Sequence, residues 1–199
     1  MGLDSVELLV EVEKFFDITI TNQEAEQIYT VEDFAKIVSK YISFHHKEIA
    51  LFDEISIKIM YYFEQNYNLK ISNKHLLEDI LPLENRQHIW DNLGMYLGLK
   101  IPNLNKPDLT ENYNPKNIKF LGITINTIFE KKPLIKNQSV SNFIDWIISI
   151  NYKSLFNPLI VNDLYEIERI IIGITSEKIG IDVNDIELHH SFTNDLGVD

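Results

Sequence analysis

Gly2-Leu3-Asp4-Ser5-Val6-Glu7-Leu8-Leu9 opens the stretch that decides the fold of this 199-residue chain. Apolar residues from Val6 to Phe16 recur at helical spacing and predict a helix over 5–16, with Asp4 as its N-cap and Glu7 completing a capping box. Thr30 is expected to cap a second helix that runs to about Ile42. About 40 residues is near the lower limit for independent folding, so this N-terminal segment needs a partner.

The C-terminal segment supplies a matching set of elements. Asp163 is expected to cap a helix of about four turns, whose apolar face comprises Leu164, Ile167, Ile170, Ile171, Ile174 and Ile179. After Gly180 follows a long loop, with Ile186, Leu188, Phe192 and Leu196 as its apolar anchors. We therefore predict an all-α protein in which 1–43 and 160–199 form one domain and 44–159 form a mainly helical central domain.

Both ends resemble parts of an acyl carrier protein, in reversed order. The N-terminal stretch from Gly2 to Phe34 is similar to the second half of that family, and 174–199, ending in Ser191-Phe192-Thr193-Asn194-Asp195-Leu196-Gly197-Val198-Asp199, to its first half. This resemblance covers about 80 residues and implies a circularly permuted four-helix bundle. A domain-swapped homodimer, in which the C-terminal helix of one chain completes the N-terminal half of another, is equally allowed by the sequence.

The central region shows a weaker likeness to the same family. Leu77-Glu78-Asp79-Ile80 resembles its Phe-x-x-Asp-Leu turn, 84–102 its second helix and exit, and 139–150 its last helix, with an insertion over roughly 104–136. Leu83, Glu84 and Asn85 stand where the family has its arm-bearing serine. A second, degenerate carrier-like bundle and an unrelated helical insertion domain explain this region about equally well.

The residue at the junction of the two ends indicates whether the chain can hold the cofactor of this family. Carrier proteins hold 4'-phosphopantetheine on the serine of an Asp-Ser motif; here Asp199 matches the aspartate and Gly2, which has no hydroxyl, matches the serine. Ser5 follows Asp4, but the family has Val-Glu-Leu four residues beyond its serine, and here Val6 follows Ser5 directly. The resemblance therefore implies a pseudo-carrier without cofactor. The alternative is a functional carrier with phosphopantetheine on Ser5.

Acidic residues concentrate at the two ends of the chain. The whole chain has a net charge of −12, of which 1–43 carry −6 and 160–199 carry −7. The resemblance implies that the first helix is a recognition helix, on which Asp4, Glu7, Glu11 and Glu13, together with Asp199, contact partners. The expected partners are basic faces of enzymes of acyl-chain (fatty acid or polyketide) synthesis, or another carrier protein. Solvated helix-face residues are the simpler interpretation of these carboxylates.

Several other classes of function are disfavoured. The acidic charge argues against nucleic-acid binding, and the absence of cysteine removes thiolate chemistry and cysteine-ligated metals. The pairs His45-His46 and His189-His190 are adjacent, and neighbours on a helix do not share a face, so we expect no metal site. No nucleophile–base motif indicates an enzyme, so we expect no catalytic residues. Without a signal peptide or an 18-residue apolar run, we expect a cytoplasmic protein that does not enter membranes.

Overall fold

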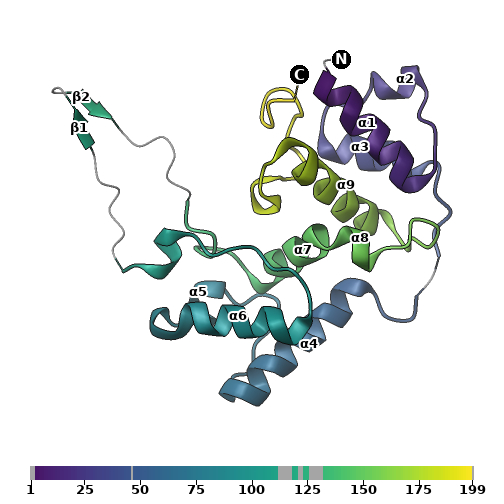
Figure 1. Cartoon of the computed structure of the whole chain (residues 1–199). Coiled ribbons are helices and arrows are strands. Elements are labelled where there is room, and N and C mark those ends of the chain that lie inside the picture. Colours follow the sequence, from purple (N-terminus) through teal and green to yellow (C-terminus); the bar gives the residue numbers. More distant parts are fainter. Residues whose placement is uncertain (1–2, 46, 112–117, 121–122, 126–131, 199) are drawn as a thin grey trace. The chain divides into compact units, whose positions relative to one another are not determined.

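The computed structural model falls into two compact units, and residues from both ends of the chain belong to the first (Figure 1). Unit 1 comprises 1–55, 99–102 and 144–199, and unit 2 comprises 56–98 and 103–143. Compared with the predicted domain of 1–43 and 160–199, unit 1 also includes 44–55, 99–102 and 144–159. The structure describes residues 3–45, 47–111, 118–120, 123–125 and 132–198.

Helix α9 (Leu164–Ile179) is the centre of unit 1. Ile167, Ile170, Ile171 and Ile174 are all fully buried, and burial continues around most of the helix circumference between Glu166 and Thr175. A helix that is buried on all sides must be covered by several neighbours. In unit 1 those neighbours are α1 (Leu3–Phe16), α3 (Val31–Ser39), α8 (Tyr152–Leu155) and the short 3-10 helix η3 (Val183–Asp185).

Helices α1 and α3 cover α9 with amphipathic faces, but Val6 and Val10 of the apolar stripe predicted for the first helix are exposed. On α1, Leu8, Val12 and Phe16 are buried at intervals of four residues. Helix α3 buries Val31, Phe34, Ala35, Ile37 and Val38. Each fully buried apolar side chain of this size contributes about 1.5–3 kcal/mol relative to exposure. In Figure 1 the N-terminal helix and the C-terminal segment lie side by side for this reason.

The C-terminal loop is fastened to the start of α3 by backbone hydrogen bonds. Thr30 and Ser191 form an antiparallel bridge, and the Phe192 amide donates to the Tyr29 carbonyl at 3.1 Å. The Glu32 amide donates to the Leu188 carbonyl at 2.8 Å. The Glu32 amide lies in the first turn of α3 and has no partner within the helix, so this bond satisfies it.

Two of the predicted caps are confirmed, and one is wrong. The Thr30 side chain accepts from the Asp33 amide at 3.1 Å, and Asp163 accepts from the Glu166 amide at 2.9 Å. Asp4 is not an N-cap, because α1 already begins at Leu3 and Asp4 lies in its first turn. There its carboxylate remains favourable to the helix dipole. Helix α3 ends at Ser39 rather than near Ile42, because the last amides form tighter bonds to carbonyls three residues back.

Unit 1 is completed by the end of α7 (Val140–Ile150) and by the four-residue helices α2 (Asn22–Ala25) and α8. The α7–α8 corner approaches α9 closely at Gly173. A Cβ atom placed on Gly173 would lie 2.3 Å from the Ser149 carbonyl oxygen and 2.5 Å from a ring carbon of Tyr152. Only glycine allows this approach without displacing backbone.

Unit 2 has its own apolar core. Its helices are most of α4 (Leu51–Tyr67), α5 (Leu77–Ile80), α6 (Arg86–Leu97) and the start of α7, with 3-10 turns η1 (Leu83–Asn85) and η2 (Lys106–Leu109). The rings of Trp90 and Phe143 lie 4.6 Å apart in this core. Its other fully buried side chains include Ile59, Phe63, Leu77, Leu81 and Leu93.

The beginning of α7 in unit 2 repeats the arrangement at the beginning of α3. Ser139 precedes α7 and forms an antiparallel bridge with Leu76, just as Thr30 pairs with Ser191. The Ser139 hydroxyl accepts from the Asn142 amide at 3.2 Å, and the Asn142 side chain accepts from the Ser139 amide at 3.3 Å. Thr30 and Asp33 exchange the same two bonds. Two helices of the chain thus share one capping and bridging pattern.

Residues at both ends of the predicted insertion are hydrogen-bonded to one buried carboxylate, that of Asp108. Asp108 is fully buried, and it accepts hydrogen bonds from the amides of Asn105, Leu134 and Ile135 at 2.8–3.1 Å. Within the insertion, strands β1 (Ile118–Phe120) and β2 (Ile123–Ile125) form an antiparallel pair in which Lys119 faces Thr124 in the register. The mainly helical character predicted for the chain is confirmed, whereas this hairpin was not predicted. No helix in the described residues is long and apolar enough to cross a membrane.

The close approach at Gly173 gives a test of the packing around α9. Replacing Gly173 with alanine should lower the free energy of unfolding by about 1–3 kcal/mol, because the added methyl group meets the Ser149 carbonyl. In an uncrowded helix the same change would stabilise by up to about 1 kcal/mol. Urea denaturation followed by circular dichroism measures the sign, and a more stable Gly173→Ala variant would contradict the described packing.

Candidate functional site

The exposed face of α1 combines acidic and apolar side chains. Asp4 and Glu7 are exposed, and Val6 and Val10 are 43% and 52% exposed. Val6 and Val10 lie on the side of α1 away from the buried stripe of Leu8 and Val12, whereas Asp4 lies one turn before Leu8, at the exposed start of the helix. These four exposed residues (Asp4, Val6, Glu7 and Val10) are called the α1 face. Exposed aliphatic side chains between carboxylates form a surface on which a basic, partly apolar partner can dock.

The two other acidic residues predicted on this helix have partners within unit 1. The Glu11 carboxylate forms an ion pair with Lys178 of α9, with an N–O distance of 3.2 Å. Glu13 accepts a hydrogen bond from the Ile20 amide at 2.7 Å, which closes the loop after α1. Both side chains therefore help to hold α1 in place. Asp199, the fifth predicted contact residue, lies outside the described residues, as does Gly2.

A second acidic position lies at α2, which borders the same end of unit 1. Glu24 belongs to a capping box with Thr21, and its carboxylate also accepts a hydrogen bond from the Tyr41 hydroxyl. Hydrogen bonds from Tyr41 and then Thr21 lower the pKa of Glu24, so this carboxylate stays charged. This contact was not predictable from sequence, because Tyr41 fits the apolar spacing of the helix before it and the two residues are 17 positions apart.

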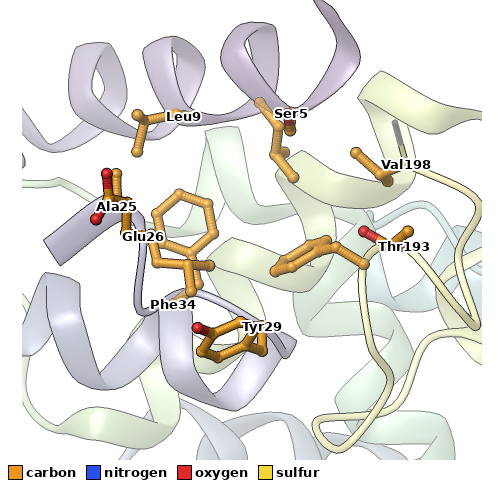
Figure 2. A pocket seen from close by; sticks show the side chains of 11 residues that line it. Ser5, Leu9, Ala25, Glu26, Tyr29, Phe34, Thr193 and Val198 are labelled. Atoms are coloured by element: carbon orange, nitrogen blue, oxygen red, sulfur yellow. The ribbon is translucent and has the colours of Figure 1, made fainter. Parts of the chain in front are cut away.

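An apolar pocket of about 300 Å³ lies beneath α1, between the two ends of the chain (Figure 2). Phe34 and Ala25 are buried in its wall, and Ser5, Glu26 and Thr193 are polar residues among its lining. The remaining lining residues are Leu8, Leu9, Ile28, Tyr29, Phe192 and Val198. Its volume is at the lower end of the range for small-molecule sites. Because Phe192, Thr193 and Val198 come from the C-terminal segment, neither end of the chain forms this pocket alone.

Ser5 is the one serine among the lining residues of this pocket. It lies in the first turn of α1, is partly buried, and contributes to the pocket lining (Figure 2). Ser176 and Ser191 have structural roles: the Ser176 hydroxyl donates to the Ile181 carbonyl at 2.6 Å, and Ser191 accepts from the Asn194 amide at 3.2 Å. Ser5 is therefore the serine to test for a covalent cofactor.

A buried ionic cluster elsewhere in unit 1 escaped sequence reasoning. Asp145 accepts a hydrogen bond from the Tyr165 hydroxyl at 2.6 Å and lies 3.5 Å from the Arg169 guanidinium. Burial raises the pKa of Asp145, while the Arg169 charge opposes this shift. The cluster joins α7 to α9 and is separate from the pocket lining, so it has the character of a structural ion pair. Asp145 is 20 residues before Tyr165 in sequence, and no local pattern predicts their meeting.

Comparison with known proteins supports a likeness limited to part of the chain. A stretch of 41 residues, 21% of this chain, is 48% identical to an acyl carrier protein of Karelsulcia muelleri (strain GWSS). The matched stretch spans about half (49%) of that relative. This chain therefore contains a segment similar to acyl carrier proteins. No family model matches the chain, and no solved structure matches it.

The pocket can be tested through the contact between its two aromatic walls. The rings of Phe34 and Phe192 meet edge to face with centroids 6.0 Å apart. Replacing Phe192 with alanine should destabilise the protein by about 3–5 kcal/mol through lost burial and a larger cavity. Urea denaturation measures this loss. Phe44→Ala is the matched control, since Phe44 is 49% exposed and should change stability by less than about 0.5 kcal/mol. Equal effects of the two changes would contradict the assigned role of Phe192.

Proposed function

We propose that this protein is an acyl-carrier-like pseudo-carrier, which presents an acidic recognition helix to partners of acyl-chain synthesis without holding phosphopantetheine. The observation that carries the proposal is the α1 face, where the carboxylates of Glu7 and of the first-turn residue Asp4 are exposed on the same helix as Val6 and Val10. Carboxylates at such a surface attract a basic partner at long range, and the aliphatic side chains supply contact area on arrival. The proposed partners are basic faces of fatty acid or polyketide synthesis enzymes, or of another carrier protein.

The packing of the chain ends supports a permuted carrier fold. Helices α1 and α3 follow one another at the N-terminus, and α9 with its loop reaches them from the C-terminus. The similarity to the Karelsulcia protein extends over half of that relative, as expected if one half of a carrier is read at one end of this chain. The pocket between both ends corresponds in chemistry to an interior that can accept an apolar chain.

The absence of the arm is inferred from one position. Gly2 stands where the carrier family has its modified serine, and glycine offers no hydroxyl to a transferase. Ser5 is the alternative attachment site, and in that case the protein would be a functional carrier. Ser5 lies one turn further along, within α1 rather than before it, and it is partly buried beside the pocket. Both features favour a structural role for Ser5.

Unit 2 fits a second, degenerate module of the same kind. The bridge between Leu76 and Ser139 and the capping of α7 by Ser139 match those of Ser191, Thr30 and α3. Leu83, Glu84 and Asn85 occupy the turn before α6, at the place expected for an attachment serine. We infer that this module is also arm-less. A scaffold that carries two such modules, including a domain-swapped dimer, is the second candidate function.

The first test of the proposal is covalent loading. The purified protein, incubated with coenzyme A and a promiscuous phosphopantetheinyl transferase, should show no gain in intact mass, while an ordinary carrier protein in the same reaction is modified. The Gly2→Ser variant should gain one phosphopantetheine group, because it restores the hydroxyl at the matching position. A gain by the unaltered protein that disappears in Ser5→Ala would instead establish the functional carrier.

The second test addresses recognition by α1. The unaltered protein should inhibit loading of the ordinary carrier by competing for the basic face of the transferase, and inhibition should weaken in high salt. The double variant Asp4→Asn, Glu7→Gln should inhibit about tenfold less, since two charges of the docking surface are lost. Asp53→Asn, on α4, is the control and should inhibit like the unaltered protein. Equal inhibition by all three proteins would contradict docking through α1.

A further inference from the structure

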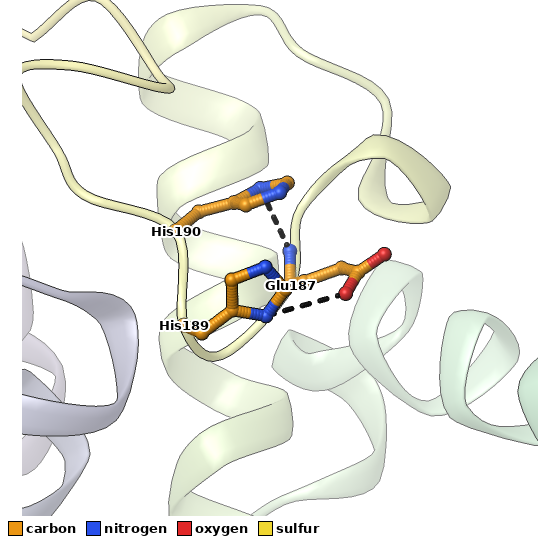
Figure 3. Close-up of side chains that lie close together, drawn as sticks. All are labelled: Glu187, His189 and His190. Carbon is orange, nitrogen blue, oxygen red and sulfur yellow. Dashed lines mark hydrogen bonds and ion pairs between the residues drawn. The ribbon is translucent and has the colours of Figure 1, made fainter.

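Glu187, His189 and His190 gather on one turn of the C-terminal loop, just after η3 (Figure 3). The His190 amide donates to the Glu187 carbonyl at 3.0 Å, which closes the turn. One ligand atom from each side chain lies within 4.8 Å of the other two. The expectation that neighbouring histidines diverge assumed a helix, and it does not apply to this turn. Of the other pair, His45 donates its amide to the Val161 carbonyl, and His46 lies outside the described residues.

The turn is held in place by the N-terminal segment. The Glu32 amide donates to the Leu188 carbonyl at 2.8 Å, and the Val31 amide donates to the His190 carbonyl at 3.2 Å. Backbone on both sides of His189 is therefore fixed against the first turn of α3. A fixed backbone lowers the entropy cost of bringing three side chains onto one ligand.

The geometry points to a binding site for a divalent transition-metal ion, of which Zn²⁺ is the representative, at Glu187, His189 and His190. Two imidazoles and one carboxylate form a ligand set typical of zinc, with a fourth position left for water. Imidazole nitrogens favour Zn²⁺, Ni²⁺ and Cu²⁺ over Mg²⁺ and Ca²⁺, which prefer oxygen ligands alone. The surroundings are acidic as well, because Glu32 and Asp33 begin the helix that holds the turn.

Binding requires a small rearrangement of exposed side chains. Atoms that bind a tetrahedral Zn²⁺ at about 2.0–2.1 Å are roughly 3.4 Å from one another. The ligand atoms of the three residues here lie within 4.8 Å of one another, so the side chains must move closer together to bind the ion. His189 already approaches Glu187, with 3.3 Å between its Nδ1 and a carboxylate oxygen, and both side chains are mostly exposed. The Nδ1 atom of His190 accepts from the Glu187 amide at 3.1 Å. Coordination by Nδ1 would replace this bond, and coordination by Nε2 would move the ring proton to Nδ1, so the expected affinity is moderate.

Metal binding at this turn would also strengthen the junction between the chain ends. The ion binds the three side chains in the fixed turn, whereas the unfolded segment must first be ordered, so binding favours the folded state; any binding to the unfolded segment reduces the gain. Binding of this kind stabilises a protein by about 2.7 kcal/mol when the free ligand is at 100 times its dissociation constant. The turn is hydrogen-bonded to residues that begin α3, so the gain would appear in the stability of unit 1.

Isothermal titration of the untagged protein with ZnCl₂ tests the site. We expect one Zn²⁺ per chain, with about tenfold or greater loss of affinity in each of Glu187→Ala, His189→Ala and His190→Ala. His88→Ala is the matched control, since His88 is an exposed histidine that hydrogen-bonds to Asn92. Binding should weaken as the pH is lowered from about 7.5 to about 5.5, because protons compete for imidazole. Zinc should raise the melting temperature of the unaltered protein and of the control, but not of the three variants.

Three outcomes would overturn the site. The unaltered protein could fail to bind Zn²⁺, the variants could bind as tightly as the control, or Mg²⁺ could displace Zn²⁺ at equal concentration. The last two results would assign the ion to the acidic surface instead of the turn. Circular dichroism of each variant without metal checks that the fold is intact, which separates a lost ligand from a lost structure.

Discussion

The burial of α9 is the constraint on which the rest of unit 1 depends. Its isoleucines are buried on nearly every side, and the partners that cover them come from opposite ends of the chain. Neither the 40 or so N-terminal residues nor the C-terminal helix encloses a core alone, and chains of that size rarely fold independently. The junction is then fixed by directional contacts, including the bridge between Thr30 and Ser191 and the ion pair of Glu11 with Lys178.

This arrangement determines which surfaces remain for function. Helix α1 packs one face on α9, lines the pocket with Ser5, Leu8 and Leu9, and has one face in solvent. Its carboxylates are of two kinds: Glu11 and Glu13 are held by contacts within the unit, whereas Asp4 and Glu7 are exposed. The same junction holds the turn that carries Glu187, His189 and His190. The proposed docking face, the pocket and the proposed metal site therefore all depend on the two ends being together.

Local features were predictable from sequence, and long-range ones were not. Thr30 and Asp163 were recognised as caps, because an N-cap acts on amides only two or three residues away. The buried face of α3 followed from its spacing, whereas on α1 the same kind of spacing also included Val6 and Val10, which are exposed. By contrast, Asp145 meets Tyr165 and Arg169 only through packing, and Asp108 joins segments 26 residues apart. Asp4 was misplaced because α1 begins at Leu3, two residues earlier than its capping pattern indicated. The resemblance of the two ends to one family could indicate that they meet, but not the individual contacts.

The central claim is that both ends of a single chain fold into one unit. Nuclear Overhauser spectroscopy on isotopically labelled protein, at a concentration where sedimentation shows a monomer, tests it most directly. We expect cross-peaks between the ring protons of Phe34 and Phe192 and between residues Thr30 and Ser191, all within one molecule. The absence of these cross-peaks from a folded monomer would contradict it. So would their appearance only between labelled and unlabelled chains of a dimer.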